Sequence, residues 1–320
     1  EFQLVFFHAR GDYLEKTLPQ GSRRLVSGRL EVFDGMAQIV HFGHFISESL
    51  SRIWGADLVG KLDGVIIQPI MARQPLMPYI VTFLDFFLPG ANFVRPLRPT
   101  CYERILVPDP IRFPPGYMRG GSMVRSFFHA RTRTPELTDG KTPKRLFVSR
   151  AALRKPGSTT NKAGFVCEAQ LDELMRAEGY TVFYPEQHSP AEQLRHYNNA
   201  EELVFAEGST IHLYVLTARP GQKVYFLWRR KRMAPNFAQQ LTSFTGERLR
   251  GSSKVTRMFY RRNAPGVVPW ALSELDFDAL RDDLVAEEMI SGRNWVSPSA
   301  AEMAEDLERQ AEAYDLDNPF

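Results

Sequence analysis

The segment ELVFAEGSTIHLYVL, residues 202–216, sets two apolar runs on either side of a short polar stretch. The first run, ELVFA, predicts a buried strand, and the second predicts a helix that contains His212. Between the two runs stand Glu207, Gly208, Ser209 and Thr210. A strand that turns through glycine into a helix leaves unpaired N–H groups that attract an anion, and small residues let a phosphate come close. The stretch therefore predicts a phosphate-binding turn. The alternative is a helix capped by Ser209, with His212 in the core.

The composition is that of an ordinary soluble protein. Its 320 residues, of which 43% are apolar and 24% charged, suit two domains. The net charge of +3 is too small for a dedicated nucleic-acid-binding protein, so we expect no nucleic acid partner. The two cysteines, Cys101 and Cys167, lack metal-ligand spacing and favour a reducing, cytoplasmic setting. No apolar run reaches the about 20 residues that a membrane-spanning helix needs.

Short apolar segments alternate with helical patterns along the chain, which predicts parallel sheets with crossover helices. The predicted strands are residues 3–7, 64–68, 104–108, 145–150, 180–185, 202–206 and 223–228. The predicted helices are residues 44–57, 74–88, 167–178, 190–199 and 209–218. A polar, proline-containing stretch, residues 129–145, predicts a linker. We therefore expect two α/β domains, residues 1–135 and 136–290, followed by a tail of residues 291–320 that forms an acidic, exposed helix.

Further polar residues follow the predicted strand 145–150. Arg150 ends this strand, a basic loop rich in Gly, Ser and Thr comes next, and a helix begins near Glu168. In doubly wound sheets, ligands bind at the carboxyl ends of the strands. We therefore expect Arg150 to face the same crevice as the 208–210 turn, where its guanidinium can pair with a diphosphate through two hydrogen bonds.

The ordered set of motifs in residues 145–226 resembles glycosyltransferase family 61. The matching segments are VSR (148–150), CEAQLDEL (167–174), GYTVFYPE (179–186), SPAEQLRHYNNAEELVFAEGSTIH (189–212) and PGQKV (220–224). Two positions depart from the family pattern, because Cys167 stands where the family usually has Asn and Glu207 where it usually has His. The EGS-x-x-H form is similar to that of bacterial members, which suggests a role in the synthesis of capsular polysaccharide or another glycan.

The first half of the chain resembles the family's other signature. In HFGHFISESLSRIW, residues 41–54, the pattern H-x-x-x-D/E is represented by His44 and Glu48. Residues four apart on a helix lie on one face, with their Cβ atoms about 5–6 Å apart. Sugar transfer needs a base that accepts the proton of the acceptor hydroxyl, and a carboxylate or an imidazole suits this role. Either residue is a candidate base. The alternative is a hydrogen-bonded pair that steadies the helix.

The resemblance implies two Rossmann-like domains that face a cleft, the arrangement called GT-B. It also implies inverting transfer from a nucleotide-diphosphate sugar, without a metal ion or another cofactor. The residues assigned to the donor are Arg150, Asn161, Lys162, Glu168, Glu207, Gly208, Ser209, Thr210 and His212. A buried carboxylate beside a phosphate is repulsive unless it is paired, so Glu207 is expected to pair with an arginine or a sugar hydroxyl.

Two other functions stay open at this stage. A noncatalytic relative would bind a nucleotide or polysaccharide and assist envelope glycan assembly. A dinucleotide oxidoreductase is disfavoured, because no G-x-G-x-x-G follows a predicted strand. For a transferase, the expected partners are a nucleotide-sugar donor and a glycan or lipid-linked acceptor, with the oligomeric state left open. The basic run RRKR, residues 229–232, predicts a solvated patch or a peripheral contact with an anionic acceptor or the inner membrane.

Overall fold

The computed structural model describes residues 45–59, 64–67, 76–96, 105–113, 117–153, 164–232, 235–262, 266 and 271–314. At its centre lies a five-stranded parallel sheet of order β10-β9-β8-β5-β7. Its strands are β5 (Arg145–Val148), β7 (Thr181–Phe183), β8 (Glu202–Ala206), β9 (Lys223–Leu227) and β10 (Arg250–Ser252). The α/β class and the parallel sheet predicted for the second half are therefore confirmed.

The connections make this a doubly wound sheet. The crossover helices are α5 (Glu168–Ala177), α6 (Pro190–Asn199), α7 (Thr210–Val215) and α8 (Pro235–Thr245). Counting β5 as the first strand, the order across the sheet is 2-1-3-4-5. The chain first runs from β5 to β7 at one edge and then returns to β8 on the other side of β5. The strand order therefore reverses between β5 and β8, and such a switch point is where open α/β sheets bind ligands.

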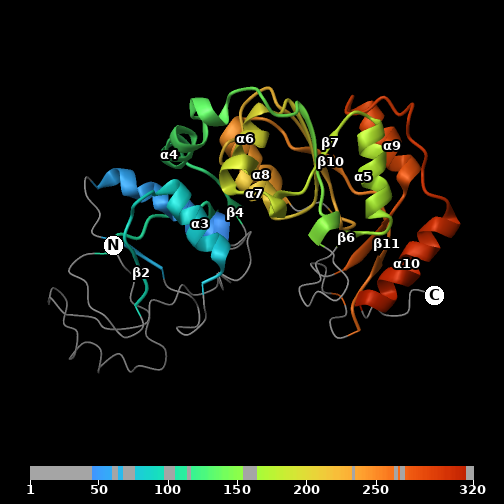
Figure 1. Cartoon of the computed structure of the whole chain (residues 1–320), viewed down its shortest axis with the longest axis horizontal. Helices are drawn as coiled ribbons and strands as arrows, with labels where there is room; N and C mark the ends of the chain where they lie inside the picture. Colours follow the sequence, from blue (N-terminus) through green and yellow to red (C-terminus); the bar gives the residue numbers. More distant parts are fainter. Residues whose placement is uncertain are drawn as a thin grey trace, which may run out of the picture.

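Helices cover both faces of the sheet. Leu146 and Leu203 point into a core shared with α6, α7 and α8, whereas Phe147 and Val204 point into a second core. The second core is shared with α5 and with α9 (Phe277–Ala286). Figure 1 shows α6, α7 and α8 on one side of the strands and α5 and α9 on the other. Strands buried on both faces need apolar residues at successive positions, which explains runs such as ELVFA.

Local sequence fixes the ends of two crossover helices. At the start of α6, the Ser189 side chain accepts from the backbone N–H of Glu192, and the Glu192 carboxylate accepts from the backbone N–H of Ser189, over 2.8 Å. This capping box satisfies two N–H groups that would otherwise be unpaired. At the end of α5, Gly179 adopts φ +87°, a conformation that favours glycine. Both ends were predicted from the sequence, and both are confirmed.

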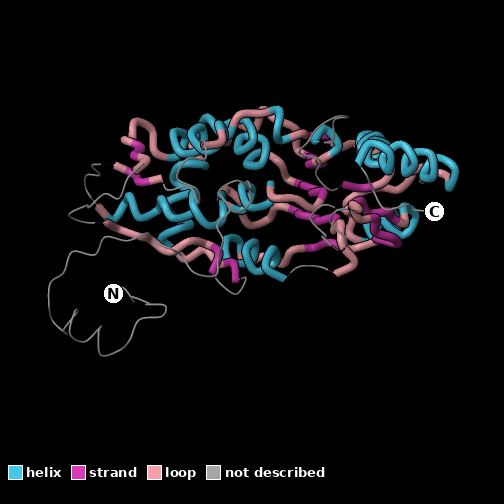
Figure 2. The backbone as a smooth tube through the Cα atoms, turned by 90° about the horizontal axis from the view of Figure 1, so that it is seen from below, coloured by secondary structure: helices cyan, strands magenta, loops and turns pink. Residues whose placement is uncertain are grey.

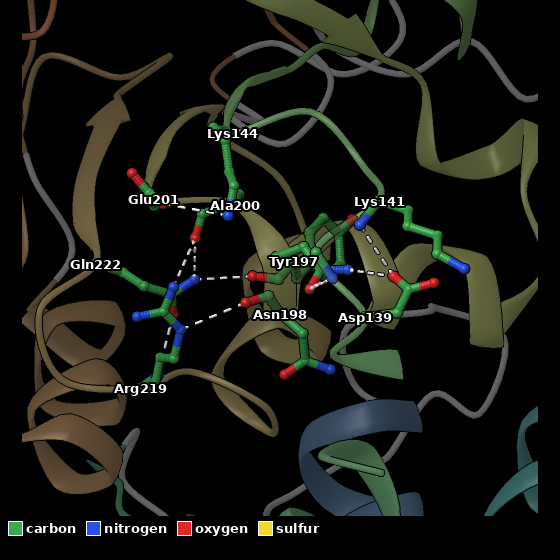
Figure 3. A network of polar contacts seen from close by, with 11 residues as sticks. Asp139, Lys141, Lys144, Tyr197, Asn198, Ala200, Glu201, Arg219 and Gln222 are labelled. Atoms are coloured by element: carbon green, nitrogen blue, oxygen red, sulfur yellow. Dashed lines mark hydrogen bonds and ion pairs between the residues drawn. The ribbon is translucent and has the colours of Figure 1, made fainter. Parts of the chain in front are cut away.

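The amino ends of the strands carry a separate polar network, drawn in Figure 3. Nε2 of Gln222 donates to the carbonyls of Tyr197 and Ala200, in each case over 2.8 Å. Nη2 of Arg219 also donates to the Ala200 carbonyl, over 3.3 Å, and its Nε donates to the Asn198 carbonyl, over 3.4 Å. These bonds satisfy carbonyls at the end of α6 that have no intrahelical partner. The network therefore holds the end of α6 at the amino ends of the strands, whereas the switch point lies at their carboxyl ends.

The first half packs beyond α6, α7 and α8 rather than on the sheet itself (Figure 1). Its helical segments are η1 (Phe45–Ser49), η2 (Leu50–Leu58), α3 (Pro78–Phe87) and α4 (Ser122–Thr132). Its strands form two short pairs, β1 (Val65–Ile66) with β2 (Phe93–Val94), and β3 (Arg112–Phe113) with β4 (Tyr117–Met118). Seen from below in Figure 2, most strand segments lie toward the C-terminal end of the molecule. A second Rossmann-like domain and the boundary at residues 135–136 therefore stay predictions.

One sequence-based expectation for this half is wrong. Residues 105–107 form no strand, and their side chains are exposed. The residues that follow are bound by hydrogen bonds from Arg52 and Trp54 of η2 to the carbonyls of Pro108 and Asp109. The predicted linker 129–145 begins inside α4 and continues through η3 (Pro135–Leu137), and its role as a linker stays a prediction. The predicted strand 3–7 lies outside the described residues.

The C-terminal part adds a small sheet and two helices. The sheet has the order β11-β12-β6, with β6 (Gly164–Phe165), β11 (Val255–Phe259) and β12 (Leu272–Leu275). The short helices η4 (Ala151–Leu153) and η5 (Pro185–Gln187) follow β5 and β7. The predicted acidic helix is present as α10 (Ala300–Tyr314), but it is not exposed all round, because Asp306 and Leu307 are buried against the second core. No helix in the described ranges is long and apolar enough to cross a membrane.

Candidate functional site

Arg150 and Gly208 meet at the switch point of the sheet. Arg150 follows β5, and Gly208 follows the neighbouring β8. A β-carbon built at residue 208 would stand 3.3 Å from Cδ and Cζ of Arg150 and closer still to its Nη1. Residue 208 must therefore be glycine if Arg150 is to keep this position. The two residues that were expected to share one edge of the sheet are in direct contact there.

Glu207, directly before this glycine, is a buried carboxylate held by the residues that follow β9. Its side chain is 1% exposed. Oε2 accepts from the backbone N–H of Arg229 over 2.8 Å, and Oε1 forms an ion pair with the Arg230 guanidinium. Of the two partners expected for Glu207, an arginine or a sugar hydroxyl, the structure shows the arginine.

Arg229 places a buried guanidinium beside Arg150. The Nε of Arg229 donates to the backbone carbonyl of Glu207 over 2.8 Å. Arg229 as a whole is 7% exposed. The pKa of Arg229 is lowered to about 9, mainly by burial and also by the positive charge of Arg150, while Glu207 acts in the opposite direction. Because a guanidinium with such a pKa still carries its charge at pH 7, Arg229 adds a second positive charge beside Arg150.

Two carboxylates of α5 are buried near the switch point, where Glu168 acts on Arg229 and Asp172 on Ser149 and Tyr184. Glu168 begins the helix and Asp172 follows one turn later, and they are 1% and 2% exposed. Oε2 of Glu168 accepts from the backbone N–H of Phe165 over 3.4 Å. Burial raises the pKa of Asp172 to about 6, although hydrogen bonds from Ser149 and Tyr184 act in the opposite direction. These groups compensate part of the positive charge at the switch point.

The other residues of the predicted phosphate-binding turn are placed less favourably. Ser209 stands at the N-cap of α7, but its side chain makes no capping hydrogen bond, and α7 has 6 residues. His212 is 5% exposed, with Nδ1 2.6 Å from Oε1 of Gln240 and its ring stacked on Phe237. His212 therefore lies between α7 and α8, as in the alternative of a core histidine. A helix this short contributes little dipole, so the arginines dominate the electrostatics of the site.

Glu48 lies on a segment that contacts the same region. It belongs to η1, a π-helical turn that packs against α7, and its side chain is partly buried. Its backbone carbonyl accepts from Nε of Arg52 over 2.9 Å. His44, Asn161 and Lys162 lie outside the described residues. The expected geometry of the His44–Glu48 pair therefore stays a prediction.

The chain matches the model of a known protein family. The model of the family described as Glycosyltransferase 61 matches residues 42–225, which is more than half of the chain. The chain belongs to the glycosyltransferase 61 family. Membership indicates a sugar-transferring enzyme, and the matched range contains Glu48, Arg150 and Gly208. A search of curated proteins found no match.

Arg229 and Arg230 were missed as site residues of this family-61 chain. The sequence analysis assigned them to a basic surface patch, although they directly follow the strand 223–228. The rule that placed Arg150 at the edge of the sheet applies to them as well. Both residues lie beyond the range that the family model matches.

The described residues offer no obvious metal site. Among them, no group of three or more His, Cys, Asp and Glu side chains is arranged to hold a metal ion. In the Asp-x-Asp stretch 276–278, Oδ1 of Asp276 accepts from the backbone N–H of Ala279, capping α9, and Asp278 pairs with Arg281. A second such stretch, residues 315–317, lies outside the described ranges. Independence from metal stays a prediction.

Proposed function

We propose that the chain transfers a sugar from a nucleotide-diphosphate donor to a hydroxyl group of a glycan or lipid-linked acceptor, with inversion and without a metal ion. Family membership supports the transferase class. The observation that carries the choice of donor is the contact of Arg150 with the Glu207–Gly208 turn at the switch point of the sheet. A cationic edge of this kind suits a diphosphate leaving group.

In this proposal, Arg150 acts on the leaving group. Negative charge grows on the bridging oxygen of the diphosphate as the bond to the sugar breaks, and a guanidinium placed beforehand stabilises it. Gly208 makes room for this guanidinium, because a β-carbon at residue 208 would collide with it. Asn161, Lys162 and Glu168 are assigned to the remaining donor contacts, and Ser209, Thr210 and His212 to the wall of the site.

The acceptor side is assigned to Glu48 and His44. One of them accepts the proton of the acceptor hydroxyl while its oxygen attacks the anomeric carbon of the sugar. The place of Glu48 suits this role, because it is partly buried on η1, which packs against α7 directly after the Glu207–Gly208 turn. We place the reaction in the cytoplasm, where the exposed Lys231 and Arg232 are available to an anionic acceptor or a membrane surface.

A thermal-shift screen tests the donor. The purified protein is mixed with UDP, GDP, CMP or TDP and with their sugar conjugates, with and without EDTA. A ligand at about 100 times its Kd stabilises by about 2.7 kcal/mol, which raises the Tm by a few degrees. We expect one nucleoside diphosphate to raise the Tm independently of EDTA, and Arg150→Ala to abolish the shift.

The exposed Arg248→Ala, which removes the same charge elsewhere, is the matched control and should keep the shift. Sensitivity to EDTA would contradict independence from metal. Binding without transfer to any acceptor, unchanged by Glu48→Gln, would instead favour the noncatalytic relative.

A further inference from the structure

Two arginines approach the Glu207–Gly208 turn from opposite sides. Arg150 follows β5 and Arg230 follows β9, and these strands flank β8 in the sheet. Neighbouring strands are about 4.8 Å apart, so the two strand ends are separated by about 10 Å. Each side chain nevertheless reaches the turn after β8, because Arg150 packs on Gly208 and Arg230 pairs with Glu207. The two guanidinium groups are therefore directed toward one place.

The backbone of Arg230 is fixed by three neighbouring elements. Ser253, after β10, donates its hydroxyl to the Arg230 carbonyl over 2.5 Å. Ser273 of β12 donates in the same way to the Arg229 carbonyl, also over 2.5 Å, and Glu207 accepts from the Arg229 N–H. A side chain whose base is held in this way loses little further freedom when it binds a ligand.

Burial separates Arg230 from Lys231 and Arg232, the last two basic residues of the 229–232 run. The Arg230 side chain is 31% exposed, whereas its partner Glu207 is 1% exposed. Nε of Arg230 is buried and has no hydrogen-bond partner within the described ranges. A guanidinium has five N–H donors, so the ion pair with Glu207 leaves donors for an anion. Lys231 and Arg232 are exposed and have no comparable anchor in the described structure.

We propose that Arg230 is a second diphosphate-binding residue, which grips the pyrophosphate group together with Arg150, and that Glu207 is the positioning residue that holds Arg230 in place. This inference rests on the proposed function. It replaces the surface-patch interpretation of Arg230 and assigns a ligand contact outside the part of the chain that the family model matches. It also gives the unusual Glu207 a role, since a carboxylate here orients an arginine on the next strand.

The test compares diphosphates with monophosphates. Binding of UDP, GDP and TDP, and of UMP, GMP and TMP, is measured by calorimetry for the unchanged protein and for Arg230→Ala. Losing a hydrogen bond between a guanidinium and a phosphate weakens binding by about tenfold or more. We expect this loss for the diphosphate that binds and a change of less than about threefold for its monophosphate. Arg248→Ala, which removes the same charge at an exposed position outside the site, should leave both unchanged.

Glu207→Gln tests positioning, because glutamine can still accept from the Arg229 N–H but no longer attracts Arg230. It should weaken diphosphate binding when Arg230 is present and should not weaken it further in the Arg230→Ala protein. Since Arg230→Ala leaves a buried carboxylate unpaired and so costs stability, Arg230→Lys and the double variant Arg230→Ala with Glu207→Gln are measured alongside. Lysine keeps the charge without the planar fork and should restore part of the affinity.

The outcomes separate this inference from the function on which it rests. If the unchanged protein binds none of the three diphosphates, both fail. If it binds one, and Arg230→Ala, Arg230→Lys and the double variant bind it as well as Arg248→Ala does, Arg230 has no ligand contact and the proposed donor site survives without it. If Glu207→Gln weakens binding equally with and without Arg230, Glu207 does not act through Arg230.

Discussion

Arg150 lies so close to Gly208 that no β-carbon fits between them. In Gly208→Ala the added methyl group would meet the end of a flexible side chain, so the guanidinium moves and the fold is retained. We expect binding of the nucleoside diphosphate to weaken by about tenfold or more, because a charge-assisted hydrogen bond is lost, while the Tm of the ligand-free protein stays within about 2 °C. Calorimetry and a thermal scan measure the two effects.

Gly121→Ala, where a β-carbon meets nothing within 4 Å, is the control for the substitution itself. Unchanged binding in Gly208→Ala would show that Arg150 does not touch the donor.

Glu48 is expected to act in the chemical step and not in donor binding. Removing a general base lowers the rate by about 10²- to 10⁴-fold, so Glu48→Gln should lose transfer by that factor and keep the thermal shift with the donor nucleotide. His44→Ala, measured in parallel, distinguishes the base from its partner, because the partner's loss should cost less. The exposed Asp57→Asn on the adjoining η2 is the control. Equal loss of donor binding and transfer in Glu48→Gln would place this residue on the donor side.

Asp306 of α10 accepts a hydrogen bond of 2.7 Å from the backbone N–H of Cys167, the residue directly before Glu168. Cys167 adopts φ +56°, which is uncommon for a residue with a side chain, so this bond helps to hold a costly conformation at the start of α5. Asp306→Ala leaves a buried N–H group unpaired and should lower the free energy of unfolding by about 1–3 kcal/mol. Urea denaturation measures this loss. Glu308→Ala, on an exposed position of the same helix, should change it by less than about 0.5 kcal/mol, and an equal effect of both would mean that the bond contributes nothing.

The sequence predicted the central sheet because its determinants are local. Runs such as ELVFA, the capping residues Ser189 and Glu192, and Gly179 at the end of α5 each specify an element without reference to the rest of the chain. The carboxyl-edge rule then brought Arg150 and Gly208 together correctly. These predictions needed only the pattern of strands and helices.

The parts that sequence analysis missed depend on contacts between distant residues. The pairing of Glu207 with Arg230 requires β9 to lie beside β8, and the strand order does not follow from composition or spacing. The apolar run 104–108 resembles a strand in isolation, but its described residues, 105–108, pair with no described strand, and η2 binds the carbonyls of Pro108 and Asp109 instead. Glu48 was expected on a regular helix, whereas it lies on a π-helical turn, whose wider i→i+5 bonding a sequence pattern does not reveal.

Asp172 should make the stability of the protein depend on pH. Burial raises its pKa in the folded protein to about 6, from the ordinary aspartate pKa of 3.8, so the folded state binds a proton more tightly than the unfolded state. The resulting stabilisation is fully present below about pH 4 and is lost as the pH rises through 6, and it amounts to about 2–3 kcal/mol. Asp172→Asn cannot lose a proton, so its free energy of unfolding relative to the unchanged protein should rise between pH 4.5 and pH 7 in urea denaturation. Asp282→Asn, on an exposed position of α9, is the control and should show no such change. The difference in free energy of unfolding between Asp172→Asn and the unchanged protein could instead be the same at both pH values. That result would mean that the carboxyl group is ionised in the folded state throughout, held so by the hydrogen bonds from Tyr184 and Ser149.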